Sequence, residues 1–124
     1  MLVLTQALGA SPLLEFAVLI GSRSNGTAHD QSDWDIALQW KYDVAWLEML
    51  GHTETLRAQL ASALGVPLDR VDLIELRRAN LAMRAAVAEE GVPLLGEDTL
   101  AWAHFLKRTW RELEDHYWEK THAA

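Results

Sequence analysis

The order of apolar and polar residues along the chain predicts three strands. Residues 16–20 form a continuous apolar run that ends at Gly21, which is typical of a strand buried on both faces. Residues 33–40 begin with alternating acidic and apolar side chains, and this period of two predicts a second strand. Residues 70–76 predict a third strand, with Asp72, Ile74 and Leu76 on one face.

Helical spacing accounts for most of the remaining sequence. The first ten residues predict a short helix, and residues 43–64 predict a longer one, with Gly51 as a candidate break and Gly65 at its end. Two further helices are expected, one from the cap Asn80 to about residue 90 and one from the cap Asp98 to about residue 120. The last helix carries a predicted core-facing stripe made by Trp102, Leu106, Trp110, Leu113 and Tyr117. The expected fold class is α/β in the broad sense (α+β), a small mixed β-sheet covered by helices.

Length and composition narrow the possible classes of protein. A chain of 124 residues provides one hydrophobic core, so residues 1–124 are expected to form a single domain. The absence of cysteine excludes disulfide bonds and thiolate zinc sites. The apolar opening segment has no positively charged start, and no run reaches the ~20 residues that span a bilayer. We therefore expect a cytoplasmic protein without membrane contact.

The charge balance bears on the choice of partner. The net charge of -7 arises from 18 acidic and 11 basic residues. Non-specific nucleic-acid binding requires a basic surface that displaces counterions from phosphates, so nucleic acid is disfavoured as a direct partner. An acidic protein instead suits a basic protein partner, because complementary charge guides their encounter.

Candidate chemistry lies in the polar segment after the first predicted strand and in the strands that follow. Gly21-Ser22 predicts a small turn, where backbone N–H groups and a hydroxyl can approach a phosphate because glycine has no Cβ. Asp33 and Asp35 project from one face of the second strand, about 7 Å apart at their Cα atoms. Asp72 interrupts the apolar third strand, where an unpaired charge is costly. Three such carboxylates offer the oxygen ligands that Mg²⁺ prefers.

This arrangement resembles the signature of the DNA polymerase β-like nucleotidyltransferase superfamily: Gly21-Ser22, ten intervening residues, and then Asp33-x-Asp35. The short length and the later strand around Asp72 are similar to the smallest members, the minimal nucleotidyltransferase (MNT) proteins. The resemblance implies the nucleotidyltransferase fold, two Mg²⁺ ions bound by Asp33 and Asp35, and ATP as substrate. It further implies that Asp72 completes the metal site, polarises the acceptor hydroxyl, or does both. Gly21 and Ser22 would hold the outer phosphates of the nucleotide.

The resemblance also implies a biological role. MNT proteins are typically encoded beside a HEPN-domain protein, and the pair resembles a toxin–antitoxin system in which the HEPN protein is an RNase toxin. The implied function is an antitoxin that transfers AMP from ATP to a tyrosine of its cognate HEPN toxin. Two alternatives stay open: a non-catalytic antitoxin that masks the toxin by binding, and a small-molecule nucleotidyltransferase of the aminoglycoside-modifying type.

Several of these residues also have a purely structural interpretation. An isolated Asp-x-Asp pair is often the solvated face of an edge strand, and only its combination with Gly21-Ser22 and Asp72 favours a metal site. Residues 24–26 and His29 are expected to shape the loop. Arg77 and Arg78 follow the third strand, where they can reach a triphosphate, face an acidic partner or remain solvated.

Overall fold

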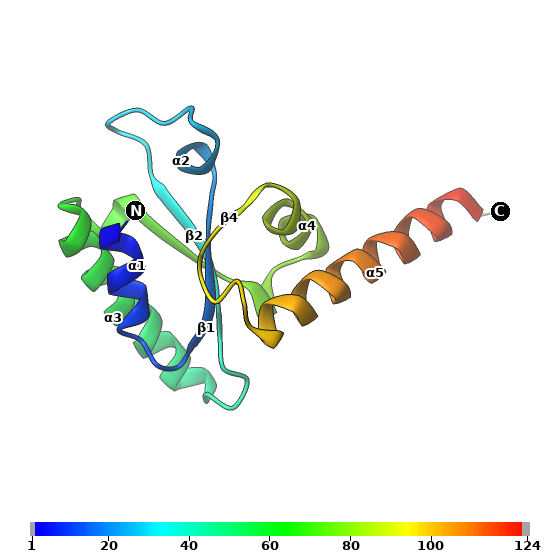
Figure 1. Cartoon of the computed structure of the whole chain (residues 1–124), viewed down its shortest axis with the longest axis horizontal. Helices are drawn as coiled ribbons and strands as arrows, with labels where there is room; N and C mark the ends of the chain where they lie inside the picture. The colour runs from blue at the N-terminus through cyan, green and yellow to red at the C-terminus, as the bar shows by residue number, and fades with distance from the viewer. Residues whose placement is uncertain (1, 123–124) are drawn as a thin grey trace.

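A four-stranded mixed sheet lies between two layers of helices in the computed structural model, which describes residues 2–122 (Figure 1). This architecture confirms the predicted fold class. The elements follow in chain order as α1 (Leu2–Gly9), β1 (Leu14–Ile20), α2 (Ser22–Asn25), β2 (Trp34–Trp40), α3 (Trp46–Leu64), the 3-10 turn η1 (Leu68–Arg70), β3 (Val71–Glu75), the 3-10 turn η2 (Leu76–Arg78), α4 (Leu81–Glu90), β4 (Val92–Leu95) and α5 (Leu100–His122).

The strands lie in the order β3-β2-β1-β4. β1 pairs antiparallel with both β2 and β4, whereas β2 and β3 are parallel. A parallel pair needs a long crossover connection, and α3 provides it between β2 and β3. β1 and β2 therefore occupy the centre of the sheet, and both are buried along most of their length.

Alternate residues of the central strands point into two separate cores. One core lies between the sheet and the α1–α3 layer, and on β2 it receives Ile36 and Leu38. The other core lies between the sheet and the α4–α5 layer, and it receives Ala37 from β2. Three rings interlock in this second core, with centroids 5.1 to 5.5 Å apart: Phe16, Trp102 and Phe105. Asp35 shares the strand face of Ala37, so its carboxylate lies at one end of the α4–α5 side.

The helix boundaries agree with some sequence predictions and correct others. Gly65 adopts a left-handed conformation and ends α3, as predicted, and the Asn80 side chain caps α4 by accepting a hydrogen bond from the Met83 N–H at 2.9 Å. The predicted break at Gly51 is wrong, because α3 runs unbroken through this exposed position from Trp46 to Leu64. The predicted cap of α5 is also wrong, because the hydroxyl of Thr99, and not the Asp98 carboxylate, accepts from the Trp102 N–H at 3.3 Å.

The sequence interpretation missed β4 altogether. This strand consists of four residues and contains Pro93, which has no N–H to donate and normally signals a break. The proline is tolerated because β4 is the edge strand and pairs only with β1. The strand also connects α4 to α5, and it thereby places the last helix over the sheet.

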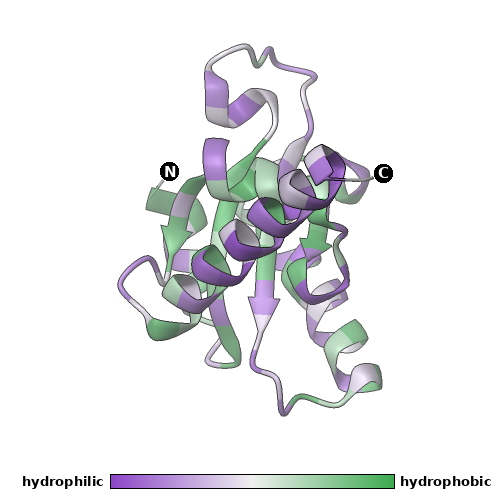
Figure 2. Ribbon diagram, turned by 90° about the vertical axis from the view of Figure 1, so that its right-hand side faces the viewer, coloured by the Kyte–Doolittle hydropathy of each residue, from purple (hydrophilic) through white to green (hydrophobic). Residues whose placement is uncertain are grey.

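The last helix corrects the prediction about its aromatic stripe. The buried residues of α5 are Trp102, Phe105 and Thr109, whereas Trp110 and Tyr117 are exposed. The helix projects beyond the sheet toward the C-terminus (Figure 1), and hydrophilic residues dominate its projecting part (Figure 2). The helical spacing of apolar residues continues beyond the part of α5 that packs on the sheet, so the later residues of the stripe lie in solvent. Among residues 2–122, no helix combines the length and the apolar character needed to span a bilayer.

Candidate active site

Strand register brings the predicted carboxylates to one end of the sheet. Asp35 is the second residue of β2, and it pairs with Ile20 at the end of β1 on one side. On its other side Asp35 pairs with Asp72 of the parallel strand β3. Residues directly opposite each other on adjacent strands share a face, so the two carboxylates are cross-strand neighbours. Asp33 lies two residues before Asp35, exposed at the end of the loop.

The turn after β1 approaches Asp35 closely. Gly21 has φ 73° and ψ -159°, a conformation that is essentially restricted to glycine. An added Cβ at Gly21 would lie 2.5 Å from Oδ2 of Asp35. Ser24 holds the turn, because its hydroxyl donates to the Gly21 carbonyl at 2.7 Å. The backbone of Gly21 therefore lies closer to the Asp35 carboxylate than the backbone of any residue with a Cβ could lie.

The polar loop between α2 and β2 is held by its own side chains, as predicted. Asn25 Oδ1 accepts from the Thr27 N–H at 3.1 Å, and Gly26 closes α2 in a left-handed conformation. The His29 ring nitrogen Nδ1 accepts from the Gln31 N–H at 3.1 Å. These contacts give residues 25–31 a defined shape, and they use the His29 imidazole inside the loop.

Arg23 is an anchor for the same loop that the sequence interpretation did not single out. Its guanidinium donates to the carbonyls of His29 at 3.2 Å and Ser32 at 3.0 Å. It also lies 4.2 Å from the centroid of the Trp34 ring, a cation–π arrangement. Trp34 packs against the α1–α3 core, on the opposite strand face from Asp35, as expected for a residue between two same-face aspartates.

Negative charge accumulates at this end of the sheet. Burial raises the pKa of the Asp35 carboxyl above its ordinary value, and the negative charges of Asp72 and Asp33 raise it further. Within residues 2–122, none of the three carboxylates takes part in an ion pair. A cluster of negative charges without a cationic side chain is costly, and a bound cation would relieve that cost.

The donor chemistry fits Mg²⁺, although the ligands do not form a closed set. All three groups are carboxylates, the oxygen ligands that this hard cation selects. In the described part of the chain, no group of three or more carboxylate or imidazole side chains is arranged to hold a metal ion. The structure thus brings Asp35 and Asp72 together as strand neighbours and leaves Asp33 at the margin.

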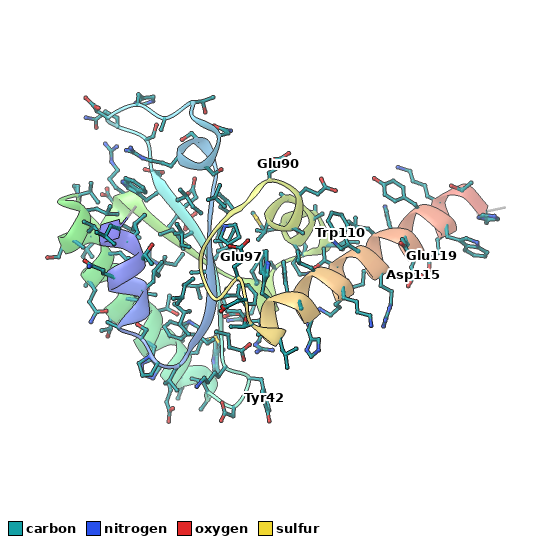
Figure 3. The ribbon with its side chains drawn as sticks, in the orientation of Figure 1. Tyr42, Glu90, Glu97, Trp110, Asp115 and Glu119 are labelled. Atoms are coloured by element: carbon teal, nitrogen blue, oxygen red, sulfur yellow. The ribbon has the colours of Figure 1, made fainter. Side chains whose placement is uncertain are left out.

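A cavity of about 400 Å³ opens beside the two strand-paired carboxylates. Of the five predicted site residues, Gly21, Asp35 and Asp72 line it, while Ser22 and Asp33 do not. The sequence interpretation missed the opposite wall, which α4 provides at helical spacing with Met83, Ala86 and Glu90. Figure 3 labels Glu90 at the end of this helix. Those three positions share one helix face, but nothing local to α4 indicates which part of the sheet that face covers.

The comparison with family models decides the classification. The model described as polymerase beta nucleotidyltransferase matches residues 4–100, which is most of the chain. The chain belongs to this nucleotidyltransferase family. No curated protein matches it.

Solved structures agree with this family assignment. The chain is similar to a chain in a toxin–antitoxin crystal structure with AMP-PNP, with 28% identity, a TM-score of 0.73, and coverage of 96% of this chain and 90% of that one. It is similar to a chain in the MntA-HepT toxin–antitoxin structure, with 25% identity, a TM-score of 0.63, and coverage of 94% and 86%. It is also similar to a chain in a structure of a tri-AMPylated Shewanella oneidensis HEPN toxin in complex with MNT antitoxin, with 26% identity, a TM-score of 0.64, and coverage of 94% of this chain and 85% of that one. The resemblance of this nucleotidyltransferase to the MNT antitoxins is confirmed.

Proposed function

We propose that this nucleotidyltransferase is an antitoxin that transfers AMP from ATP to a tyrosine of a cognate HEPN toxin. The observation that carries the proposal is the cross-strand pairing of Asp35 with Asp72 beside the Gly21 turn. Two similar solved complexes supply the partner and the nucleotide: one contains an AMPylated HEPN toxin, and another contains the ATP analogue AMP-PNP.

The nucleotide would bind in the cavity lined by Gly21, Asp35 and Asp72. Its volume of about 400 Å³ is within the range of small-molecule sites. The exposed backbone of Gly21 and the hydroxyl of Ser22 would face the outer phosphates, where the lack of a Cβ lets the backbone come close. Asp35 and Asp72 would hold Mg²⁺ together with Asp33 from the loop end. The bound cation would supply positive charge that offsets the charge on the phosphate oxygens.

The reaction is an in-line displacement at the α-phosphorus of ATP. The tyrosine oxygen forms a bond to the α-phosphorus, and the bond from that phosphorus to the bridging oxygen of the β-phosphate breaks, so pyrophosphate leaves. The phenolic proton passes to a base, and Asp72 is an exposed carboxylate at the cavity. The chain's main contribution is to position the nucleotide against the acceptor.

Intact-mass measurement of the toxin tests this proposal directly. When the purified protein is incubated with ATP, Mg²⁺ and a cognate HEPN toxin, the toxin should gain one AMP mass per modified tyrosine. Asp35→Asn should abolish the mass shift, whereas Asp69→Asn, the same change at an exposed carboxylate of η1, should not alter it. If the toxin stays unmodified after incubation with the folded wild-type protein, the proposed adenylyltransferase function is refuted.

A non-catalytic antitoxin is the second candidate function. The open arrangement of the carboxylates favours it over a small-molecule enzyme. An antitoxin that only masks the toxin would protect cells without its carboxylates. Full protection by the double variant Asp33→Asn/Asp35→Asn would therefore select this function, and loss of protection with intact toxin binding would select the enzyme.

A further inference from the structure

A second cavity, of about 610 Å³, lies on the α4–α5 side of the sheet at the opposite end from the carboxylates. Gln39 of β2 lines it, four residues and about 13 Å along the strand from Asp35. Its walls contain four of the 11 basic residues of this acidic chain: Arg77, Lys107, Arg108 and Arg111. We call this cavity the basic groove.

Positive charge in the basic groove is only partly compensated, and the Arg108 charge also acts on Glu112 along the helix. Arg77 is paired with Glu15, at 3.3 Å. Within residues 2–122, Lys107, Arg108 and Arg111 take part in no ion pair. Gln39 is only 6% exposed, and its side-chain oxygen Oε1 has no hydrogen-bond partner among the described residues. The groove is thus built for a ligand that brings negative charge and a hydrogen-bond donor.

The other half of the same helix has the opposite character. Every residue of α5 from 114 to 122 is exposed, which leaves about 14 Å of helix without a packing partner among residues 2–122. Acidic side chains occupy this end, including Asp115 and Glu119 (Figure 3). Most helical stability in proteins comes from packing against other elements, so an unpacked end of this length is expected to have a partner.

Helical spacing places the basic and acidic residues on one continuous face of α5. The positions 104, 108, 111, 115 and 119 are separated by three or four residues, so their side chains follow one stripe. The stripe changes sign along its length: His104, Arg108 and Arg111 precede Asp115 and Glu119. A stripe with this sequence of charges is complementary to itself when a second copy lies antiparallel.

We propose that two copies of this chain pair through antiparallel α5 helices, each acidic half lying in the basic groove of the other copy. With Arg111 of one copy opposite Asp115 of the other, Glu119 lies beside Arg108. A two-fold axis repeats every pair, which gives a closed, isologous interface. The projecting half of each helix extends past its own sheet (Figure 1), so the sheet leaves that half accessible to a second copy.

Aromatic contacts supply the burial that surface ion pairs lack. Exposed ion pairs contribute at most about 1 kcal/mol each. The charges therefore determine the register of the two helices, and the affinity of the dimer must come from other contacts. Trp118 is 62% exposed and lies on the charged stripe, one turn beyond Asp115. In the proposed register it lies opposite Arg108 in the groove of the second copy, whose lining includes Tyr42, a residue that is 83% exposed. The carboxylate cavity at the other end of the strands shares no lining residue with the basic groove.

Charge-swap variants of the full chain test the pairing by sedimentation equilibrium. The wild-type protein should form dimers that weaken at high salt, because the paired charges are screened. Arg108→Glu/Arg111→Glu and Asp115→Lys/Glu119→Lys should each be monomeric, since both halves of the stripe then carry the same sign. An equimolar mixture of the two variants should form a heterodimer, and circular dichroism checks that each variant is folded.

Several outcomes would overturn the proposal. They are a monomeric wild-type protein throughout the concentration series, reversed variants that still dimerise, or folded variants whose mixture stays monomeric. Trp118→Ala should raise the dimer dissociation constant by roughly 30-fold, and an unchanged constant would also contradict the register. If the wild-type protein is monomeric and Arg108→Glu/Arg111→Glu loses binding to the HEPN toxin, the groove belongs to the toxin and the second copy is excluded.

Discussion

Gly21 and Asp35 lie so close together that a single methyl group on Gly21 would contact the carboxylate, 2.5 Å from Oδ2. Asp35 is held in place by pairing with β1 and β3, and Gly21 is the first residue after β1. The glycine conformation at φ 73° and the carboxylate position therefore depend on each other. A nucleotide phosphate beside Gly21 would necessarily lie beside Asp35.

Replacement of Gly21 by alanine tests this dependence. Gly21→Ala should lower the rate of AMP transfer by about 100-fold, because a displacement of about 1 Å at the site is that costly. The fold should survive, with a loss of stability of about 1–3 kcal/mol from the strained backbone. Single-turnover transfer to the toxin and chemical denaturation measure the two effects separately.

Gly26 offers a matched control in the same turn. It also has a positive φ, 79°, but an added Cβ there would meet no atom within 4 Å. Gly26→Ala should cost similar stability and leave transfer within a fewfold of wild type. Equal loss of activity in both variants would mean that backbone strain, and not the contact with Asp35, explains the effect.

The Asp35 carboxylate should destabilise the fold when no cation is present. Burial and the charges of Asp72 and Asp33 raise its pKa, so its ionised form is disfavoured in the folded state. Asp35→Asn should therefore raise the melting temperature by a few degrees at neutral pH in the presence of a chelator. Mg²⁺ with an ATP analogue should stabilise the wild-type protein and not the variant. A lower melting temperature for Asp35→Asn in the presence of the chelator would contradict the claim that the Asp35 charge destabilises the metal-free fold.

Local patterns predicted the elements whose causes are local. The apolar run of β1 and the cap of Asn80 require only neighbouring residues, and both predictions were correct. β4 depends on pairing with β1 at the sheet edge, which tolerates Pro93, and no pattern within the four residues reveals it. The exposure of Trp110 depends on where the sheet ends beneath α5, which is a tertiary property.

The candidate site also combines features that local sequence predicts with features that depend on tertiary packing. The spacing of Asp33 and Asp35 predicts one shared strand face, but β2 begins at Trp34 and leaves Asp33 at the end of the loop. Only the parallel register of β2 and β3 places Asp72 opposite Asp35. The wall that contains Glu90 comes from the packing of α4, which sequence spacing does not specify. The site chemistry indicated by the sequence stays a prediction, and the shape of the cavity comes from tertiary packing alone.

The ion pair between α4 and α5 should make stability depend on pH in the acid range. Arg84 and Glu112 approach to 2.5 Å, and the hydrogen bond from Arg84 lowers the pKa of the Glu112 carboxyl. A lowered folded-state pKa stabilises the fold above the ordinary value of 4.5, and this contribution is lost as the pH falls through the folded pKa.

Substitution of Glu112 measures that contribution. Glu112 is 41% exposed, so solvent screening limits the pair to less than about 1 kcal/mol. Glu112→Gln should lower the free energy of unfolding by that amount at neutral pH, and the difference should disappear in strong acid. Glu114→Gln, at an exposed position two residues further along the helix, should change the free energy of unfolding little. A Glu112→Gln deficit that persists unchanged at low pH would exclude the ion pair as its cause.

The Arg23 guanidinium should control the loop that leads to Asp33. Arg23→Lys keeps the charge but cannot donate to the His29 and Ser32 carbonyls together while it stacks on the Trp34 ring. Lost hydrogen bonds of about 1 kcal/mol each would release the loop without unfolding the sheet. Amide hydrogen exchange should accelerate in residues 27–33 and stay slow in β1 and β2, and AMP transfer should fall about tenfold because the loop positions a site carboxylate.

Arg78 provides the matched control for this change. Its guanidinium lies 3.9 Å from the centroid of the Trp46 ring, so Arg78→Lys removes the same kind of ring contact at a place that does not line the carboxylate cavity. Exchange in residues 27–33 and the transfer rate should then match the wild-type values. If Arg23→Lys and Arg78→Lys slow transfer equally, general loss of a cation–π contact explains the effect. If only Arg23→Lys accelerates loop exchange and slows transfer, the two carbonyl contacts are what keep Asp33 beside the site.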